Sequence, residues 1–358
     1  MKRNAYITNL RAIGCLLVMF SHWGVVFFTN PDVASSLGVF GNTTYTDNCY
    51  FSKVLKNIEF INFGMIGVSL FFLITGFLTP QSIEKYKKKY LSNRLIRIFP
   101  TYIVGLIFTV LVIYGSSLIN NVVFPYKIDT ILKNMTLLRL WFWAPSIDGV
   151  SWTLECQLFF SIICYVGVIG RISSDKSIPI FLMISSLYVF LNSRYFDLWI
   201  EINFKEYIFF YASDFMLTFS AFIIIGYIIS LSSIKNLGGW KTILYISIAF
   251  ICFGIDIKCL FPNDFGVYFL NYMIGITIFC LFYLYRDKIS EVSFFNRVAA
   301  ISYPFYIVHG AAGYSLLYIF KDRLGSWCLS FIITIFIIVG VSVLLHRLVE
   351  LPCVRFKG

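Results

Sequence analysis

The chain has 358 residues, of which 59% are hydrophobic and only 13% are charged, and its mean hydropathy is +0.80. This composition excludes a water-soluble globular domain and indicates a polytopic membrane protein. The net charge of +11 does not indicate nucleic-acid binding, because the basic residues lie in short runs between apolar stretches. Anionic membrane lipids and an anionic substrate are the expected partners of these runs.

Ten stretches along the chain approach the roughly twenty mostly apolar residues that a helix needs to cross a bilayer. We expect an all-α fold in which about ten transmembrane helices enclose a polar central channel. No linker divides the chain, so we predict a single transmembrane domain over residues 1–358 without an appended soluble domain. The expected spans are residues 5–28, 60–79, 100–119, 152–169, 178–192, 207–230, 242–256, 266–285, 301–320 and 327–346.

Lysine and arginine are distributed unequally between the two sides of this arrangement. With the N-terminus in the cytoplasm, 19 of the 29 basic residues lie on the cytoplasmic side, as the positive-inside rule requires. We therefore expect both termini in the cytoplasm. Two long loops, residues 29–59 and 120–150, are then expected on the outer side.

The first span carries two ionisable side chains, although each such group in a bilayer costs roughly 2.5–3.5 kcal/mol on insertion scales. Arg11 and His22 are eleven residues apart, which places them about 20° apart on one helical face. Arg11 alone fits a side chain that reaches the headgroups, and His22 alone fits a packed core histidine. Because the chain has only three histidines and imidazole is the usual general base at neutral pH, the pair indicates catalysis.

Two further arginines precede the third span. Arg94 and Arg97 are three residues apart, so both guanidinium groups lie on one helical face and are suited to bidentate phosphate binding. An ordinary anchor in the inner leaflet is the alternative. The nearby lysines 85 and 87–89 are most simply explained as the positive-inside signal.

Polar residues also occur in later spans. Glu155 lies about one turn into the fourth span, where it either forms a structural ion pair or orients an imidazole or a substrate hydroxyl. His309, in the ninth span, is either a packing hydrogen-bond partner or part of the channel lining. Glu350 is expected to pair with Arg355 or with cytoplasmic arginines.

The sequence lacks the motifs of several common enzyme classes. It contains no GxSxG, P-loop, HExxH or CxxC motif, so serine hydrolase, nucleotide hydrolase and metalloprotease chemistry have no support. The nine cysteines lie mostly inside apolar stretches without metal-type spacing, and we expect buried thiols and no bound metal.

Taken in chain order, these residues resemble the acyltransferase family 3 of membrane-bound O-acyltransferases, the group that acetylates surface polysaccharides. Each motif is weak alone, but their common order from residue 9 to residue 355 is specific. Cys156 departs from the pattern, since a second acidic residue is common there, and this leaves Glu155 as the only carboxylate at that site. The matching motifs are NLRA around Arg11 with His22, GVSLFFLITGF at 67–77, RLIRIFP at 94–100, WTLE at 152–155, ISY at 301–303 with His309, and Glu350 with Pro352 and Arg355.

The resemblance implies transfer of an acyl group, usually acetyl from acetyl-CoA, to a hydroxyl of a lipid-linked or cell-surface polysaccharide, in the cytoplasmic membrane of a bacterium. In that case Arg94, Arg97 and Arg11 bind the phosphates of acyl-CoA. His22 deprotonates the acceptor hydroxyl or relays the acyl group, and Glu155 orients His22 or the sugar. The remaining expected substrate or channel residues are Trp152, His309 and Ser69.

Two other classes of function fit part of the pattern. A transporter or flippase of an envelope glycan precursor would use His22, Glu155 and His309 as a proton or substrate path. A membrane scaffold or sensor would tolerate substitution of all these polar residues. The ordered motifs favour the enzyme.

Overall fold

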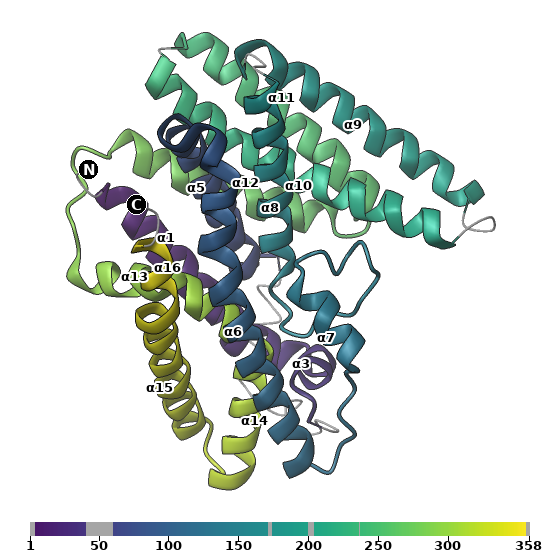
Figure 1. Cartoon of the computed structure of the whole chain (residues 1–358), viewed down its shortest axis with the longest axis vertical. Helices are drawn as coiled ribbons and strands as arrows, with labels where there is room; N and C mark the ends of the chain where they lie inside the picture. The colour runs from purple at the N-terminus through teal and green to yellow at the C-terminus, as the bar shows by residue number, and fades with distance from the viewer. Residues whose placement is uncertain (1–3, 41–59, 171–173, 200–203, 236, 356–358) are drawn as a thin grey trace.

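The computed structural model describes residues 4–40, 60–170, 174–199, 204–235 and 237–355. The described residues form helices joined by loops and contain no strand, which confirms the all-α prediction. Most of the expected outer loop at 29–59 lies outside the described residues, which resume at residue 60. The longer helices shown in Figure 1 are α1 (Ala5–Met19), α5 (Phe63–Tyr86), α6 (Tyr90–Ile119), α8 (Trp152–Ile169), α9 (Ser174–Trp199), α10 (Phe204–Lys235), α11 (Gly239–Leu260), α12 (Phe265–Leu284), α13 (Ser293–Val308), α14 (Ala311–Leu324) and α15 (Trp327–Leu345).

Within the described ranges, eight helical stretches are long and apolar enough to cross a membrane. One of them, Phe63–Ile119, contains both α5 and α6, which meet at a short turn over Lys87–Lys89. Lys87 has a φ of 47°, so the chain changes direction there. Membrane-spanning helices are therefore confirmed, whereas the count of ten is not.

The expected ninth span at 301–320 is not one helix. α13 ends at Val308 and α14 begins at Ala311, so His309 and Gly310 interrupt the helix within an apolar stretch. The freed backbone groups find partners elsewhere, because the Trp23 indole donates to the carbonyl of His309 at 2.9 Å and the amide of Ala311 donates to the carbonyl of Asp148 at 3.1 Å. Broken helices are tolerated at membrane depth only when such partners exist.

The first span also departs from a regular α-helix. Residues Phe20–Val26 form π-helical turns, followed by α2 (Phe27–Thr29) and α3 (Pro31–Gly38). A π segment widens the helix and shifts the angular position of the residues after it, and such segments occur often at functional sites. The angular relation predicted between Arg11 and His22 from a uniform helix therefore has to be replaced by their observed contacts.

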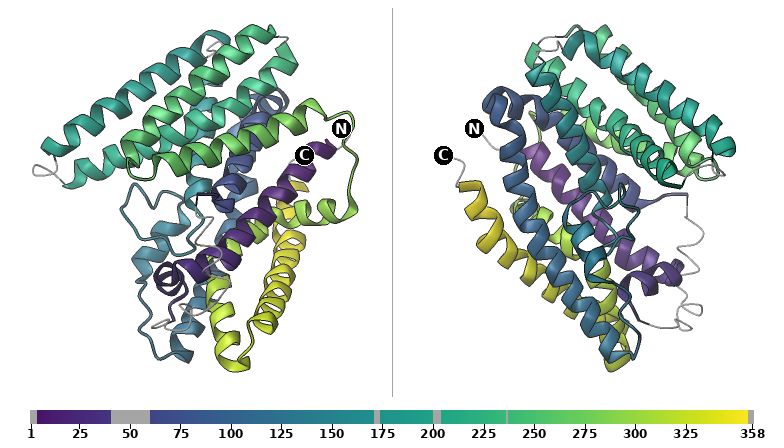
Figure 2. Two further views of the ribbon diagram at one scale, coloured as in Figure 1. Left: turned by 180° about the vertical axis from the view of Figure 1, so that it is seen from behind. Right: turned by 45° about the vertical axis from the view of Figure 1, so that its right-hand side comes forward.

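The helices pack around two neighbouring apolar cores. One core joins α5 to α9–α12, and the other joins the C-terminal half of the first span to α6 and α13–α15. Figures 1 and 2 show α9, α10 and α11 as a packed layer on one side of α5, while α14 and α15 lie on the other. The same views place the start of α1 beside α16 (Leu351–Arg355), so both ends of the described chain lie at one end of the molecule.

The crossing of α5 and α10 depends on two glycines. A Cβ at Gly226 would collide with the carbonyl oxygen of Leu73, and one at Gly76 would collide with that of Ile223. The two backbones therefore touch directly, as is common where small residues meet between membrane helices.

We predict that Gly226→Ala lowers the unfolding free energy by about 1–3 kcal/mol, because the added methyl group forces the two backbones apart. The control is Gly115→Ala, since a Cβ at Gly115 meets nothing within 4 Å. Thermal unfolding of the purified chain in detergent measures both effects. A Gly226→Ala variant as stable as the parent would show that the crossing is not as tight as described.

Candidate functional site

The helix break places the imidazole of His309 in the protein interior. His309 is fully buried, and its Nδ1 lies 2.8 Å from the carbonyl oxygen of Tyr306 and 3.2 Å from that of Phe305. A carbonyl oxygen can only accept, so Nδ1 carries the hydrogen and Nε2 keeps a lone pair. This Nε2 is buried and has no hydrogen-bond partner among the described residues. The break thus presents an unused proton acceptor inside the membrane protein.

His22 lies directly beside His309. The two ring centroids are 4.9 Å apart in an edge-to-face arrangement. The Nδ1 of His22 is 3.0 Å from the hydroxyl of Tyr314, whose ring is nearly parallel to the imidazole at 5.7 Å. Tyr314 is buried on α14, whereas His22 is half-buried. Because Tyr314 occupies Nδ1, Nε2 is the ring nitrogen of His22 that is left for a ligand.

The partner of Glu155 is an arginine and not the imidazole of His22, which the catalytic prediction requires. Its Oε1 lies 3.2 Å from the Nε of Arg139, and the two side chains are only 1% and 13% exposed. Of the two interpretations of Glu155, the structure therefore contains the ion pair. The recorded polar contact of His22 is to Tyr314, and no contact between His22 and Glu155 occurs in the described part of the chain.

A hydrogen bond nevertheless connects the helix of Glu155 to that of His309. The hydroxyls of Thr153 and Tyr306 are 2.8 Å apart, and both residues are buried. The loop before α8 is held by Asp148, whose Oδ1 accepts from the amides of Val150 and Ser151 at 3.0 Å each. Asp148 also accepts from Ala311 through its carbonyl, so this loop is fastened to the break itself.

A second polar cluster lies toward the chain termini. Glu350 is 2.7 Å from Nδ1 of His346 and 3.9 Å from Arg97, and Arg11 lies within electrostatic range of both Arg97 and Glu350. Of the two pairings predicted for Glu350, the structure contains one with an arginine other than Arg355, namely Arg97. The side chain of Arg355 lies outside the described residues.

Arg94 is positioned by its own neighbours. Its guanidinium lies 3.5 Å from Oε1 of Gln157, which also accepts from the hydroxyl of Thr75 at 2.8 Å. Tyr303 lies within electrostatic range of Arg94, Arg97 and Glu350. The structure thus places Arg97 and Arg11 near Glu350, with Arg94 close to Tyr303 of the same cluster. Three arginines against one carboxylate give the cluster excess positive charge, which suits phosphate groups.

The other two predicted channel residues lie in packed surroundings. The Trp152 ring contacts Phe72, Phe215 and Phe219 at centroid distances of 5.2–6.0 Å. Ser69 is fully buried, donates to the carbonyl of Ile66 at 2.7 Å, and lies against Gly275 of α12.

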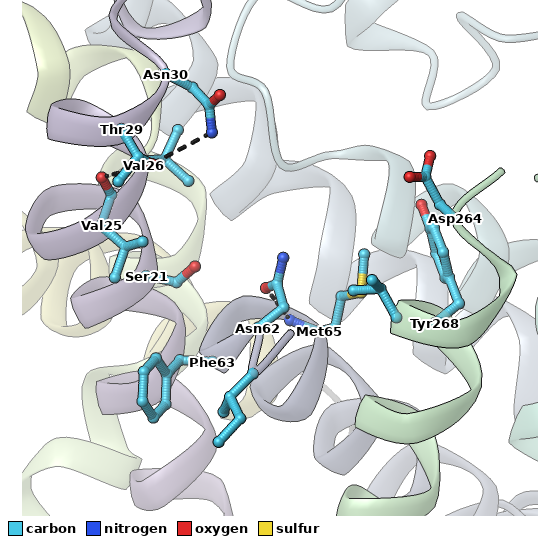
Figure 3. A pocket seen from close by; sticks show the side chains of 12 residues that line it. Ser21, Val25, Val26, Thr29, Asn30, Asn62, Phe63, Met65, Asp264 and Tyr268 are labelled. Atoms are coloured by element: carbon cyan, nitrogen blue, oxygen red, sulfur yellow. Dashed lines mark hydrogen bonds between the residues drawn. The ribbon is translucent and has the colours of Figure 1, made fainter. Parts of the chain in front are cut away.

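A cavity of about 410 Å³ opens beside the π-helical turns of the first span. Figure 3 shows it between the first span, the start of α5 and the start of α12. Ser21 and Val26, which lie just before and one turn after His22, are among its lining residues. In the described ranges, no group of three or more His, Cys, Asp or Glu side chains is arranged to hold a metal ion.

Comparison with known proteins identifies one family. The model described as an acyltransferase domain, that of acyltransferase family 3, matches residues 4–347. No curated protein and no solved structure matches the chain. The match covers nearly the whole sequence and confirms the resemblance inferred from its motifs.

The ion pair between Arg139 and Glu155 yields a stability prediction. Arg139→Met leaves a buried carboxylate without its partner, so we expect a loss of about 3–5 kcal/mol, much of which the double variant with Glu155→Leu recovers. The matched control is the exposed pair Lys133–Asp129, where Lys133→Met should cost less than about 1 kcal/mol. Thermal unfolding in detergent measures all of these variants. Equal stability of Arg139→Met and Lys133→Met would contradict the importance of the buried pair.

Proposed function

Because the chain belongs to acyltransferase family 3 and is therefore a membrane acyltransferase, we propose that it is an O-acetyltransferase. Its proposed donor is cytoplasmic acetyl-CoA, and its proposed acceptor is a hydroxyl of a cell-surface or lipid-linked polysaccharide. The observation that carries the proposal is the first span, which has Arg11 in the cationic cluster and His22 beside His309. Eleven residues of helix separate these groups by roughly 16 Å.

The donor is proposed to bind at the cationic cluster. Arg94, Arg97 and Arg11 supply three permanent positive charges for the phosphates of CoA. A ligand phosphate would compete with Glu350 for Arg97, since their separation of 3.9 Å is a loose ion pair. The thioester arm of CoA is long and flexible, so it can follow the first span from this cluster toward His22.

His22 is proposed to act as the general base. Its Nε2 takes the proton of the acceptor hydroxyl, the hydroxyl oxygen bonds to the thioester carbon, and the carbon–sulfur bond breaks. The proton then passes from Nε2 to the leaving thiolate, which gives the acetyl ester and free CoA. Tyr314 can both donate and accept, so it can hold Nδ1 in the neutral and the protonated imidazole alike.

The acceptor is proposed to approach from the other end of the first span. Trp152 and Glu155 lie there at the start of α8, and Glu155 is paired with Arg139 of the preceding loop. Thr153 joins this helix start to α13 through its hydrogen bond with Tyr306. Because the Glu155 carboxylate is buried against Arg139, its proposed role is to hold this helix start and not to contact the sugar. A relay of acetyl through His22 itself is the alternative route, and it would leave a transient acetyl-imidazole.

Transfer of radiolabelled acetyl from acetyl-CoA to glycan, measured in membranes that contain the chain, tests the proposal. We expect His22→Ala to reduce transfer at least about 100-fold, because a general base contributes 10²–10⁴-fold to such reactions. Arg11→Ala should raise the KM for acetyl-CoA. If both variants remain as active as the parent, the proposed centre is wrong, and glycan movement without acetylation would support a transporter.

Tyr314→Phe tests the positioning of the base separately. The phenyl ring keeps the packing but loses the hydrogen bond to His22, so kcat should fall roughly 10- to 100-fold, as expected for a bond to a charged group worth about 1.5–3 kcal/mol. The KM for acetyl-CoA should stay within about twofold. The control is Tyr318→Phe, one turn further along α14, where the ring stacks on Phe40. Equal kcat values for the two variants would remove Tyr314 from the mechanism.

A further inference from the structure

Hydrogen bonds fix one wall of the cavity that opens beside the π-helical turns of the first span. Asn271 of α12 is fully buried and accepts from the amide of Asn62 at 2.8 Å, while its own amide donates to the carbonyl of Phe60 at 2.9 Å. Asn62 in turn caps α5 by accepting from the amide of Met65 at 3.0 Å. These bonds join the starts of α5 and α12, so the cavity does not require a ligand to form.

The lining of the cavity has the chemistry of an uncharged polyol site. None of its twelve described lining residues is basic, which disfavours the phosphate-bearing donor. Apolar side chains cover part of the wall, and hydroxyl, amide, phenol and carboxylate groups cover the rest. Sugars present both apolar ring faces and hydroxyl edges, so this mixture suits them. The polar lining residues are Ser21, Thr29, Asn30, Asn62, Asp264 and Tyr268.

Two of these polar residues, Asp264 and Asn30, are exposed at the mouth of the cavity, where a ligand can reach them. Figure 3 shows Asp264 and Tyr268 on α12 facing Asn30 and Ser21 across the cavity. Asp264 and Asn30 are exposed, so they form its rim. Asp264 directly precedes α12, and its side chain makes no hydrogen bond that caps this helix.

Part of the cavity wall belongs to the same π-helical turns as the proposed base. A Cβ at Gly64 would come within 2.8 Å of the Ser21 hydroxyl, so α5 and the first span are in close contact at this level. Ser21 immediately precedes His22, and the π-helical turns continue to Val26 on the cavity wall. A molecule that fills the cavity therefore contacts the residue that directly precedes the proposed base.

From this placement we infer that the cavity is the acceptor subsite, which binds one short, uncharged sugar segment between Asp264, Tyr268, Asn30 and Asn62. The inference rests on the proposed acetyl transfer and adds the binding residues and the charge class of the acceptor. A volume of about 410 Å³ is near the lower limit of the 300–1,000 Å³ typical of small-molecule sites. The cavity thus accommodates a segment of glycan and not an extended chain.

The test uses the full chain in lipid nanodiscs with radiolabelled acetyl-CoA and, as probes, methyl glycosides of neutral hexoses and N-acetylhexosamines, with methyl glucuronide as the anionic comparison. For the most active neutral probe, Asp264→Ala and Asn30→Ala should each raise the KM for sugar at least about fivefold, while the KM for acetyl-CoA stays within about twofold. Val25→Trp should fill the cavity and block sugar use with acetyl-CoA binding retained. The matched control is Asp322→Ala, an exposed carboxylate near the end of α14.

The outcomes separate the inference from the proposed function. If the parent acetylates neither the probes nor the glycans of the cells that express it, the proposed function fails. If the parent is active but the cavity variants leave the KM for sugar unchanged, or raise only the KM for acetyl-CoA, the acceptor subsite is elsewhere. Preference for methyl glucuronide over the neutral probes would also overturn the inference. Selective loss of sugar affinity in the cavity variants supports it.

Discussion

A broken helix inside a membrane has to satisfy its backbone within the protein, because lipid offers neither donors nor acceptors. Much of the site follows from this constraint. The carbonyl of His309 is satisfied by Trp23 of the first span, and the amide of Ala311 is satisfied by the loop residue Asp148. Gly310 is needed because a Cβ there would collide with the Asp148 carbonyl. The bonds that secure the break therefore also hold the first span, and with it His22, against α13 and α14.

The two polar clusters differ in the kind of charge that their side chains carry. Around Glu350 lie arginines, which carry permanent charge and suit an anionic donor. Beside the break lie two imidazoles and a phenol, which exchange protons and carry no permanent charge. The first span passes through both clusters, so it is the element along which a donor bound at one cluster can deliver its acyl group to the other.

Hydropathy alone is sufficient to predict the membrane helices, because every span must be apolar over most of its length. The same criterion hides the break, since residues 301–320 remain apolar across His309 and Gly310. The π-helical turns at Phe20–Val26 are equally invisible to a uniform 100° periodicity. Such local departures depend on tertiary partners that lie far away in the sequence.

For the candidate site, too, the sequence predicts some residues but not the partners that they contact. Arg11, His22, Arg94 and Arg97 can be selected because a charge or an imidazole in an apolar context is conspicuous. Their partners are not conspicuous. Arg139 belongs to a loop without periodicity, and Tyr314 is one of 23 tyrosines. The position of Glu155 one turn into a span gives its depth in the membrane, and depth does not determine which helices are neighbours. The cavity residues are ordinary polar residues at helix ends, and only the fold brings them together.

Mass spectrometry of the surface glycans of cells with and without this chain tests the central claim most directly. Acetyl transfer predicts that deletion removes about 42 mass units from each modified sugar residue, the mass that one acetyl group adds, and that the parent chain restores them while the His22→Ala chain does not. Glycans of identical mass in all three strains, with the protein present in the membrane, would contradict the assignment of acyl transfer to this site.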